Sequence, residues 1–209
     1  MEVICQPVGP LQSNCYIVME NGQCLVIDPG DDANQISQMV KALGLKVDGI
    51  LLTHAHFDHI GGVDTLMEEF NAPCYINPAE IEALQHPVLN GSNSFMGVPP
   101  MILKTKPIAF KEGENKIGSF DVMAYYAPGH SIGSTMFAIG NNLFTGDVLF
   151  QNSIGRVDLP GGSAQQMRES LNFLKSLKQD YVVYPGHGPS TTLFYEQSHN
   201  PYLLYGFSE

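Results

Sequence analysis

The chain has 209 residues and carries 10 Lys+Arg against 21 Asp+Glu, a formal net charge of −11. Nucleic-acid phosphates and anionic lipid surfaces repel so acidic a protein. We therefore expect no nucleic-acid partner and no membrane partner. The length suits a single domain, and 44% hydrophobic residues are enough for a substantial core.

Cysteine usage bears on the cellular compartment. The four cysteines stand at irregular spacings inside apolar runs, and no two form a C-x-x-C pair. We expect buried, reduced thiols at Cys5, Cys15, Cys24 and Cys74. The sequence shows neither a secretory signal pattern nor an apolar stretch of the ~18 residues that a spanning helix needs. A cytoplasmic location is the prediction.

The first half alternates strand and helix patterns. Short β-type runs occupy residues 3–5, 15–19 and 23–27. Asn21-Gly22 between the last two is typical of a hairpin turn. Apolar residues at helical spacing predict a helix over 36–43, and residues 47–53 read as a buried strand. Further on, the patterns predict a helix over 63–70, a strand over 74–76 and a short helix over 78–85.

Residues 86–106 show little periodicity and are expected to form a loop, either a lid or a plain surface excursion. Strands are then predicted at residues 120–127, 136–139, 142–145 and 181–184. A capping box at Ser163 and Gln166 opens a helix between the last two strands. The aromatic run 193–204 is expected to pack on the sheet as a last short helix. These elements define an α/β domain.

The densest group of chemically active residues follows the strand that ends near residue 53. The six residues are His54-Ala55-His56-Phe57-Asp58-His59. Imidazole and carboxylate ligands suit zinc, iron or manganese. Four potential ligands in six residues are more than one ion can easily take from one loop. The motif therefore indicates two adjacent ions.

Three more candidates stand in similar settings downstream. His130, Asp147 and His187 each follow a predicted strand, and each has a glycine directly before it. Glycine allows the backbone to approach a site closely. A capped turn would explain any one of them, but their combination with residues 54–59 favours a metal site. His86 and His199 have no partner pattern and are expected to face solvent.

This ordered set resembles the metallo-β-lactamase superfamily, whose H-x-H-x-D-H motif is matched by residues 54–59. The resemblance extends from the first strands to about residue 190. It implies an α/β (α+β) fold: a four-layer αβ/βα sandwich of two mixed β-sheets with outer helices, and a site at the edge between the sheets. We expect residues 1–209 to form one such domain.

The resemblance also implies roles for the residues. His54, His56 and His130 would bind one ion, Asp58, His59 and His187 a second, and Asp147 would bridge both. Two divalent ions, zinc in the first instance with iron or manganese as alternatives, would lower the pKa of a shared water. The implied chemistry is hydrolysis by a metal-bridging hydroxide, with Asp58 and Asp147 as the catalytic carboxylates.

Residues 146–162 look like those of short bacterial glyoxalase II-like hydrolases, which act on thioesters such as S-lactoylglutathione. In full-length glyoxalase II a basic residue nine positions after the bridging aspartate contacts the glutathione carboxylate, and Arg156 stands there. We therefore expect Arg156 to bind substrate, a small-molecule thioester. The sequence departs from glyoxalase II by ending without the C-terminal helical domain and by placing Asp158 where a tyrosine stands.

Two other activities of the same fold stay open at this stage. A persulfide dioxygenase uses one iron held by two histidines and one aspartate. His187 speaks against it, because this residue completes a second metal site. A lactonase or other ester hydrolase is the further alternative, since the metal chemistry does not choose between ester and thioester. The native metal, the thiol carried by the substrate and the oligomeric state are not specified.

Overall fold

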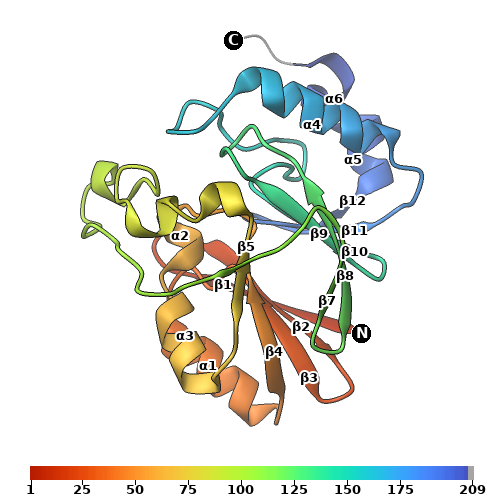
Figure 1. Cartoon of the computed structure of the whole chain (residues 1–209). Helices are drawn as coiled ribbons and strands as arrows, with labels where there is room; N and C mark the ends of the chain where they lie inside the picture. Colours follow the sequence, from red (N-terminus) through yellow and green to blue (C-terminus); the bar gives the residue numbers. More distant parts are fainter. Residues whose placement is uncertain (207–209) are drawn as a thin grey trace.

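A computed structural model of the chain describes residues 1–206, so residues 207–209 of the expected domain lie outside the described part. Two six-stranded sheets form the centre of the molecule, with helices at its lower left and its top (Figure 1). Both sheets mix parallel and antiparallel neighbours. No helix within residues 1–206 is long and apolar enough to cross a membrane.

The first sheet follows the order of the chain. Its strands are β1 (Glu2–Val8), β2 (Ser13–Glu20), β3 (Gln23–Ile27), β4 (Lys46–Leu51), β5 (Cys74–Ile76) and β6 (Ile108–Ala109). The β2–β3 hairpin turns at Asn21 and Gly22, whose φ angles of 52° and 78° confirm the predicted turn. From β3 onwards the neighbours are parallel, so these strands all end at the same edge of the sheet.

The second sheet is built from the later strands. They are β7 (Gly113–Ile117), β8 (Phe120–Tyr126), β9 (Thr135–Ile139), β10 (Asn142–Gly146), β11 (Val182–Pro185) and β12 (Thr191–Thr192). The order across the sheet is β12-β11-β10-β9-β8-β7. The parallel pair β10 and β11 ends at the edge that faces the loops of the first sheet (Figure 1).

The helices are short. They are α1 (Ala33–Ala42), α2 (Phe57–Ile60), α3 (Val63–Phe70), α4 (Ala164–Ser176), α5 (Leu193–His199) and α6 (Pro201–Tyr205). Residues 1–206 also contain three 3₁₀ turns, η1 (Pro78–Glu80), η2 (Ala83–Gln85) and η3 (Ser92–Ser94).

Three separate apolar cores show that the molecule has four layers. The first packs Ile36 and Leu66 of α1 and α3 against one face of the first sheet. The second lies between the two sheets, and the third packs Leu171 of α4 against the outer face of the second sheet. In β3, Cys24 and Val26 face the helices, whereas Leu25 and Ile27 face the other sheet. The predicted sandwich fold is confirmed.

Several local predictions need correction. The helix expected over 78–85 is two separate 3₁₀ turns, η1 and η2. The single helix expected over 193–204 is divided, because Pro201 lacks an N–H and Asn200 caps a new helix by accepting from Tyr202 N. Both helices contact α4, and α5 also contacts β12. Leu193 and Leu203 are buried in the apolar core against the second sheet, as expected. At α4, Ser163 accepts from Gln166 N, but its own N–H donates to Gly129 O, so the capping box is only half formed.

Cys5 is exposed, so the expectation that all four thiols are buried is wrong for this residue. The reason is that β1 is an edge strand. Burial raises the pKa of Cys24 and of Cys74 to about 12, which keeps these two as unreactive thiols. We expect one equivalent of a thiol reagent to react with the native protein at pH 8, and none with the Cys5→Ser variant. Rapid reaction of four thiols before denaturation would contradict this burial pattern.

Candidate metal centre

The seven predicted ligands converge at the edge where the two sheets meet. His54 and His56 lie in the loop after β4, and Asp58 and His59 lie on α2, which continues that loop. The other three come from the second sheet. His130 lies between β8 and β9, Asp147 follows β10, and His187 follows β11.

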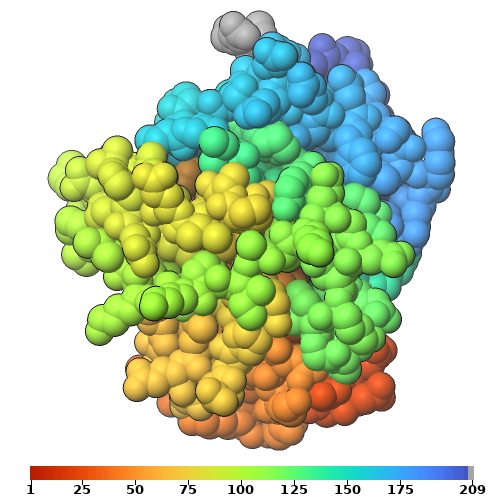
Figure 2. All heavy atoms as spheres, in the orientation of Figure 1, coloured from red at the N-terminus to blue at the C-terminus, as the bar shows by residue number. Residues whose placement is uncertain are grey.

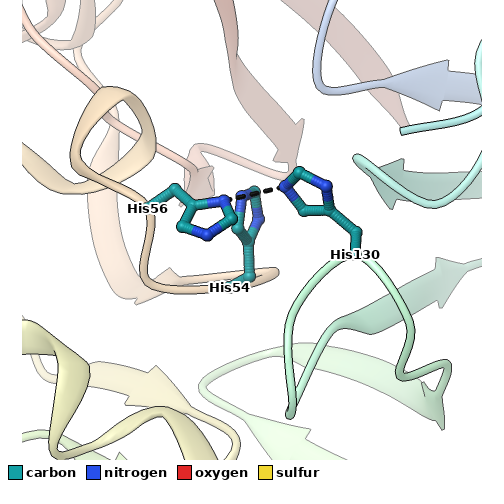
Figure 3. A group of neighbouring side chains, drawn as sticks. All are labelled: His54, His56 and His130. Atoms are coloured by element: carbon teal, nitrogen blue, oxygen red, sulfur yellow. Dashed lines mark hydrogen bonds between the residues drawn. The ribbon is translucent and has the colours of Figure 1, made fainter. Parts of the chain in front are cut away.

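His54, His56 and His130 form a first group, in which one ligand atom from each side chain lies within 4.8 Å of the others. The nearest pair is His56 Nδ1 and His130 Nε2, 2.8 Å apart. Figure 3 shows the rings of His54 and His56 rising from one loop toward His130 on the facing turn. Three imidazoles aimed at one point match a metal-binding triad.

Asp58, His59 and His187 form a second group of the same kind. His187 Nε2 lies 3.2 Å from Asp58 Oδ2, and His59 Nε2 lies 3.6 Å from the same oxygen. The ring of His59 also lies beside that of His54, with centroids 4.2 Å apart. The two groups are therefore direct neighbours.

Asp147 reaches both groups. Its Oδ2 lies 3.5 Å from His130 Nε2 and 3.6 Å from His187 Nε2. Its Oδ1 lies 3.5 Å from His59 Nε2. One carboxylate thus faces a histidine of the first group and two of the second, as a bridging ligand must.

In His54, His59 and His130 the ring nitrogen that faces away from the groups is anchored. The Thr53 hydroxyl donates to Asp28 Oδ2 at 2.6 Å, so its oxygen accepts from His54 Nδ1 at 3.0 Å. His59 Nδ1 donates to Asp28 Oδ2, and His130 Nδ1 donates to the backbone oxygen of Arg156. With the proton on Nδ1, the Nε2 lone pairs are available, which is how proteins prepare histidine for a metal.

The residues present fit divalent ions. Among the described residues, three buried polar side-chain atoms have no hydrogen-bond partner: His54 Nε2, His59 Nε2 and Asp147 Oδ1. Buried polar atoms without partners are rare in folded proteins. All three face the two groups, and a bound cation would satisfy each of them.

The charge balance supports the same conclusion. Burial, reinforced by neighbouring imidazoles, lowers the pKa of His56 to about 3. The same causes hold the pKa of His54 well below its usual range. These two rings are therefore neutral at pH 7, as ligands must be. In the second group, Asp58 and Asp147 overcome burial and raise the pKa of His59. The carboxylates thus attract positive charge to this position, which a divalent cation would supply in place of the proton.

The loop that carries His187 is held by the first sheet. Asn14 on β2 donates from Nδ2 to Pro185 O at 3.0 Å and to Gly188 O at 2.8 Å. Tyr16 Oη donates to Pro185 O at 2.6 Å. A Cβ on Gly186 would lie 2.1 Å from Asp147 Oδ1, so glycine is required for this approach. Asn14 and Tyr16 therefore fix His187 against Asp147.

A cavity of about 510 Å³ opens onto the two groups. Its walls are largely apolar and include Phe57, Phe95, Phe150 and Leu159. Phe95 belongs to the loop 86–106, which in Figures 1 and 2 forms a yellow to light-green lobe beside the cyan segment. This loop lines the cavity, so it is more than a surface excursion.

Arg156 also lines the cavity, but its guanidinium is already engaged. Nε and Nη2 donate to Asp158 Oδ1 and Oδ2 at 2.6 and 2.7 Å. The Arg156 side chain is 61% exposed, and it shares no hydrogen bond with the metal-ligand candidates. Of the predicted site residues, it is the one whose side chain neither belongs to a ligand group nor, like Asp147, lies against both groups.

Sequence reasoning missed residues that hold the centre together. Asp28 directly follows β3 and adopts φ 49°, and its carboxylate orients both Thr53 and His59. Its position, an acidic residue after a strand and near a glycine, is the same signal that identified Asp147. Asn14 carries no such signal, because its role depends on contacts between segments distant in sequence.

Comparison with known proteins agrees with this geometry. Residues 8–187 match the Metallo-beta-lactamase superfamily. The chain is 40% identical over 205 residues to the probable metallo-hydrolase YqgX of Bacillus subtilis, covering 97% of each chain. It is 32% identical over 209 residues to hydroxyacylglutathione hydrolase GloC of Haemophilus influenzae, covering 97% of this chain and 98% of that protein.

Solved structures show the same fold. BLEG-1, a B3 metallo-beta-lactamase, is 38% identical with a TM-score of 0.93, covering 97% of this chain and 100% of that one. TTHA1623, solved in a di-iron-bound form, is 37% identical with a TM-score of 0.83, covering 95% and 99%.

The chain belongs to the metallo-beta-lactamase superfamily. With its cluster of His and Asp side chains that can hold metal, it is a metallo-hydrolase of that superfamily.

Proposed function

We propose that the protein hydrolyses thioesters with two divalent metal ions. The observation that carries this proposal is the pair of ligand groups with Asp147 between them. His54, His56 and His130 would hold one ion, and Asp58, His59 and His187 the other. When bound, two such ions supply a nucleophilic water at neutral pH and polarise the scissile carbonyl.

The side chains of this chain have defined tasks in such a reaction. Asp28 and Thr53 orient His54 and His59 so that their Nε2 atoms face the two ligand groups. Asp58 and Asp147 set a negative potential that holds the cations, and their carboxylates can accept a proton. Phe57 and Phe150 cover the groups with apolar surface, which excludes bulk water from the reacting bond.

A thioester as the substrate is supported by the resemblance to GloC, whose name records the hydrolysis of hydroxyacylglutathione. Arg156 gives further support, because a guanidinium at the cavity rim can bind a substrate carboxylate through two hydrogen bonds. We propose a small-molecule thioester as the partner, and neither nucleic acid nor membrane. We propose a cytoplasmic location as well, which agrees with four cysteines that are all free.

Asp158 competes with any substrate carboxylate for Arg156, and this gives a test of the substrate-binding role. Arg156→Ala is expected to raise KM for S-lactoylglutathione by about tenfold with little change in kcat, since a hydrogen bond to a charged group is lost. Asp158→Asn is expected to lower KM, because it releases the guanidinium. Lys175→Ala removes the same charge from the exposed face of α4 and serves as control. Equal KM values in all four proteins would contradict substrate binding by Arg156.

The proposed activity is tested by the initial rate of S-D-lactoylglutathione hydrolysis with metal-reconstituted and metal-free protein. We expect kcat/KM above about 10⁴ M⁻¹s⁻¹ for the loaded protein and background for the metal-free protein. A background rate from protein carrying two ions would contradict the thioester proposal. Lactones and, with iron and O₂, persulfides are assayed in parallel. A higher kcat/KM for either class than for the thioester would replace the thioester proposal.

A second candidate is β-lactam hydrolysis, and the observation that favours it is the 38% identity to BLEG-1. The same two ions would polarise the lactam carbonyl, so the chemistry differs only in the leaving group. A kcat/KM for a β-lactam that exceeds the value for the thioester would favour this candidate.

A further inference from the structure

A buried carboxylate that is not itself a proposed metal ligand joins the two loops of the first metal group. Glu80 ends η1, directly after β5, and is 2% exposed. Its Oε2 accepts from the backbone N–H of Ala55 at 3.1 Å. Its Oε1 accepts from Ser131 Oγ at 2.6 Å and from the backbone N–H of Gly133 at 2.7 Å.

Two of these donors lie next to proposed ligands of the first group in the sequence. Ala55 separates His54 from His56, and Ser131 directly follows His130. One carboxylate on η1 therefore holds the backbone of the loop after β4 and the turn between β8 and β9. The rings of His56 and His130, 2.8 Å apart at their nearest nitrogens, stand on these two segments.

The turn after His130 is packed closely against Glu80. A Cβ on Gly133 would lie 2.8 Å from Glu80 Cγ, so the turn approaches as near as a glycine allows. Because the Ser131 hydroxyl gives its hydrogen to Glu80, the Ser134 hydroxyl must donate to Ser131 Oγ, 2.7 Å away. This network leaves the turn little freedom to move relative to Glu80.

We infer that Glu80 is a positioning residue for the first metal group. It sets the distance between the two backbone segments and thereby the spacing of the ligand nitrogens of His54, His56 and His130. It touches neither these rings nor the cavity, and acts only through Ala55, Ser131 and Gly133. The inference rests on the proposed metal centre.

Glu80→Gln is the sharpest perturbation, because it keeps the shape and removes one acceptor. An amide has one oxygen and one NH₂ group, so it cannot accept from both loops. The oxygen is expected to stay with Ser131 and Gly133, which supply two donors, and the NH₂ then opposes the N–H of Ala55. The loop that carries His54 and His56 must shift, whereas His187 stays fixed by Asn14.

The chain offers a matched control in Glu196, which is 0% exposed. Its carboxylate also accepts from three uncharged donors: Asn152 N at 2.8 Å, Thr191 Oγ1 at 2.7 Å and Asn200 Nδ2 at 2.9 Å. None of these donors lies next to a proposed metal ligand. Glu196→Gln therefore carries a comparable structural cost without the link to the metal loops.

The experiment is a titration of metal-free protein with Co²⁺, followed by the visible absorption of the bound ion and by competition with a chelator. We expect Glu80→Gln to bind the first-group ion at least about tenfold more weakly, the lower end of losses known for residues that orient metal ligands. The second ion, and both ions in Glu196→Gln, are expected to bind as in the wild type. Thermal unfolding of the metal-free variants measures the structural cost separately.

Wild-type affinity for both ions in Glu80→Gln, or an equal loss in Glu196→Gln, would overturn the inference. If Glu80→Gln does not fold, Ser131→Ala removes a single donor and is expected to weaken the binding of the first-group ion alone. An unchanged affinity for that ion would then overturn the inference. A wild-type protein that binds no ion would instead contradict the proposed metal centre itself.

Discussion

Replacing Asp147 with alanine is expected to lower kcat/KM for thioester hydrolysis by at least about 100-fold, equivalent to ~2.7 kcal/mol of barrier. The physical reason is that this carboxylate faces both groups, with Oδ2 3.5 Å from His130 Nε2 and Oδ1 3.5 Å from His59 Nε2. Without it, neither ion keeps its full ligand set. The measurement is the rate of thioester loss by metal-reconstituted variant, with metal content determined on the same sample.

Asp121→Ala is the control for this variant, because Asp121 is an exposed aspartate of the second sheet whose partner is Lys116. Its activity is expected to equal that of the wild type. If Asp147→Ala retained more than about a tenth of the activity, the loss would be only ~1.4 kcal/mol and the bridging role would be wrong.

His187→Ala is expected to reduce the metal content from two ions per chain to one and to lower hydrolysis at least about 100-fold, since a two-ion reaction loses half of its centre. The second group would keep only Asp58 and His59 as its own ligands. The first group shares no side chain with His187 and should stay loaded. Elemental analysis of dialysed protein counts the ions.

His86→Ala is the matched control, since His86 is exposed and stands in neither ligand group. It should bind two ions and turn over at the wild-type rate. One ion per chain in the wild type, unchanged by His187→Ala, would show a mononuclear centre and favour the dioxygenase alternative.

Strands that form continuous apolar runs were predictable from sequence, and β3 and β5 were expected with the bounds that the structure shows. β7 was not expected, because Gly113–Ile117 is an exposed edge strand that pairs with β8 through its backbone and presents no apolar period. β12 has two residues, too few for a pattern. Strand propensity and hydrophobic periodicity do not reveal a strand that forms because its backbone pairs with a neighbouring strand.

The ligand candidates were predictable because each follows a strand, and strands that end at one edge bring such residues together. The position of Arg156 in the motif did not reveal that its guanidinium is paired within the chain. Asp158 stands two residues away in the sequence, and its carboxylate accepts from both Nε and Nη2 of Arg156. The supports of the centre, Asn14 and Glu80, depend on contacts across 171 and 51 residues of sequence, which no local pattern reveals.

The most direct test of the two-ion centre is an anomalous-scattering map from crystals of the zinc-loaded protein. A two-ion centre should give two peaks roughly 3.5–4 Å apart, the spacing of catalytic two-metal sites. One peak should lie among His54, His56 and His130, the other among Asp58, His59 and His187, each about 2 Å from its ligand atoms, with Asp147 contacting both. A single peak on the three histidines, with His187 free of metal, would contradict it.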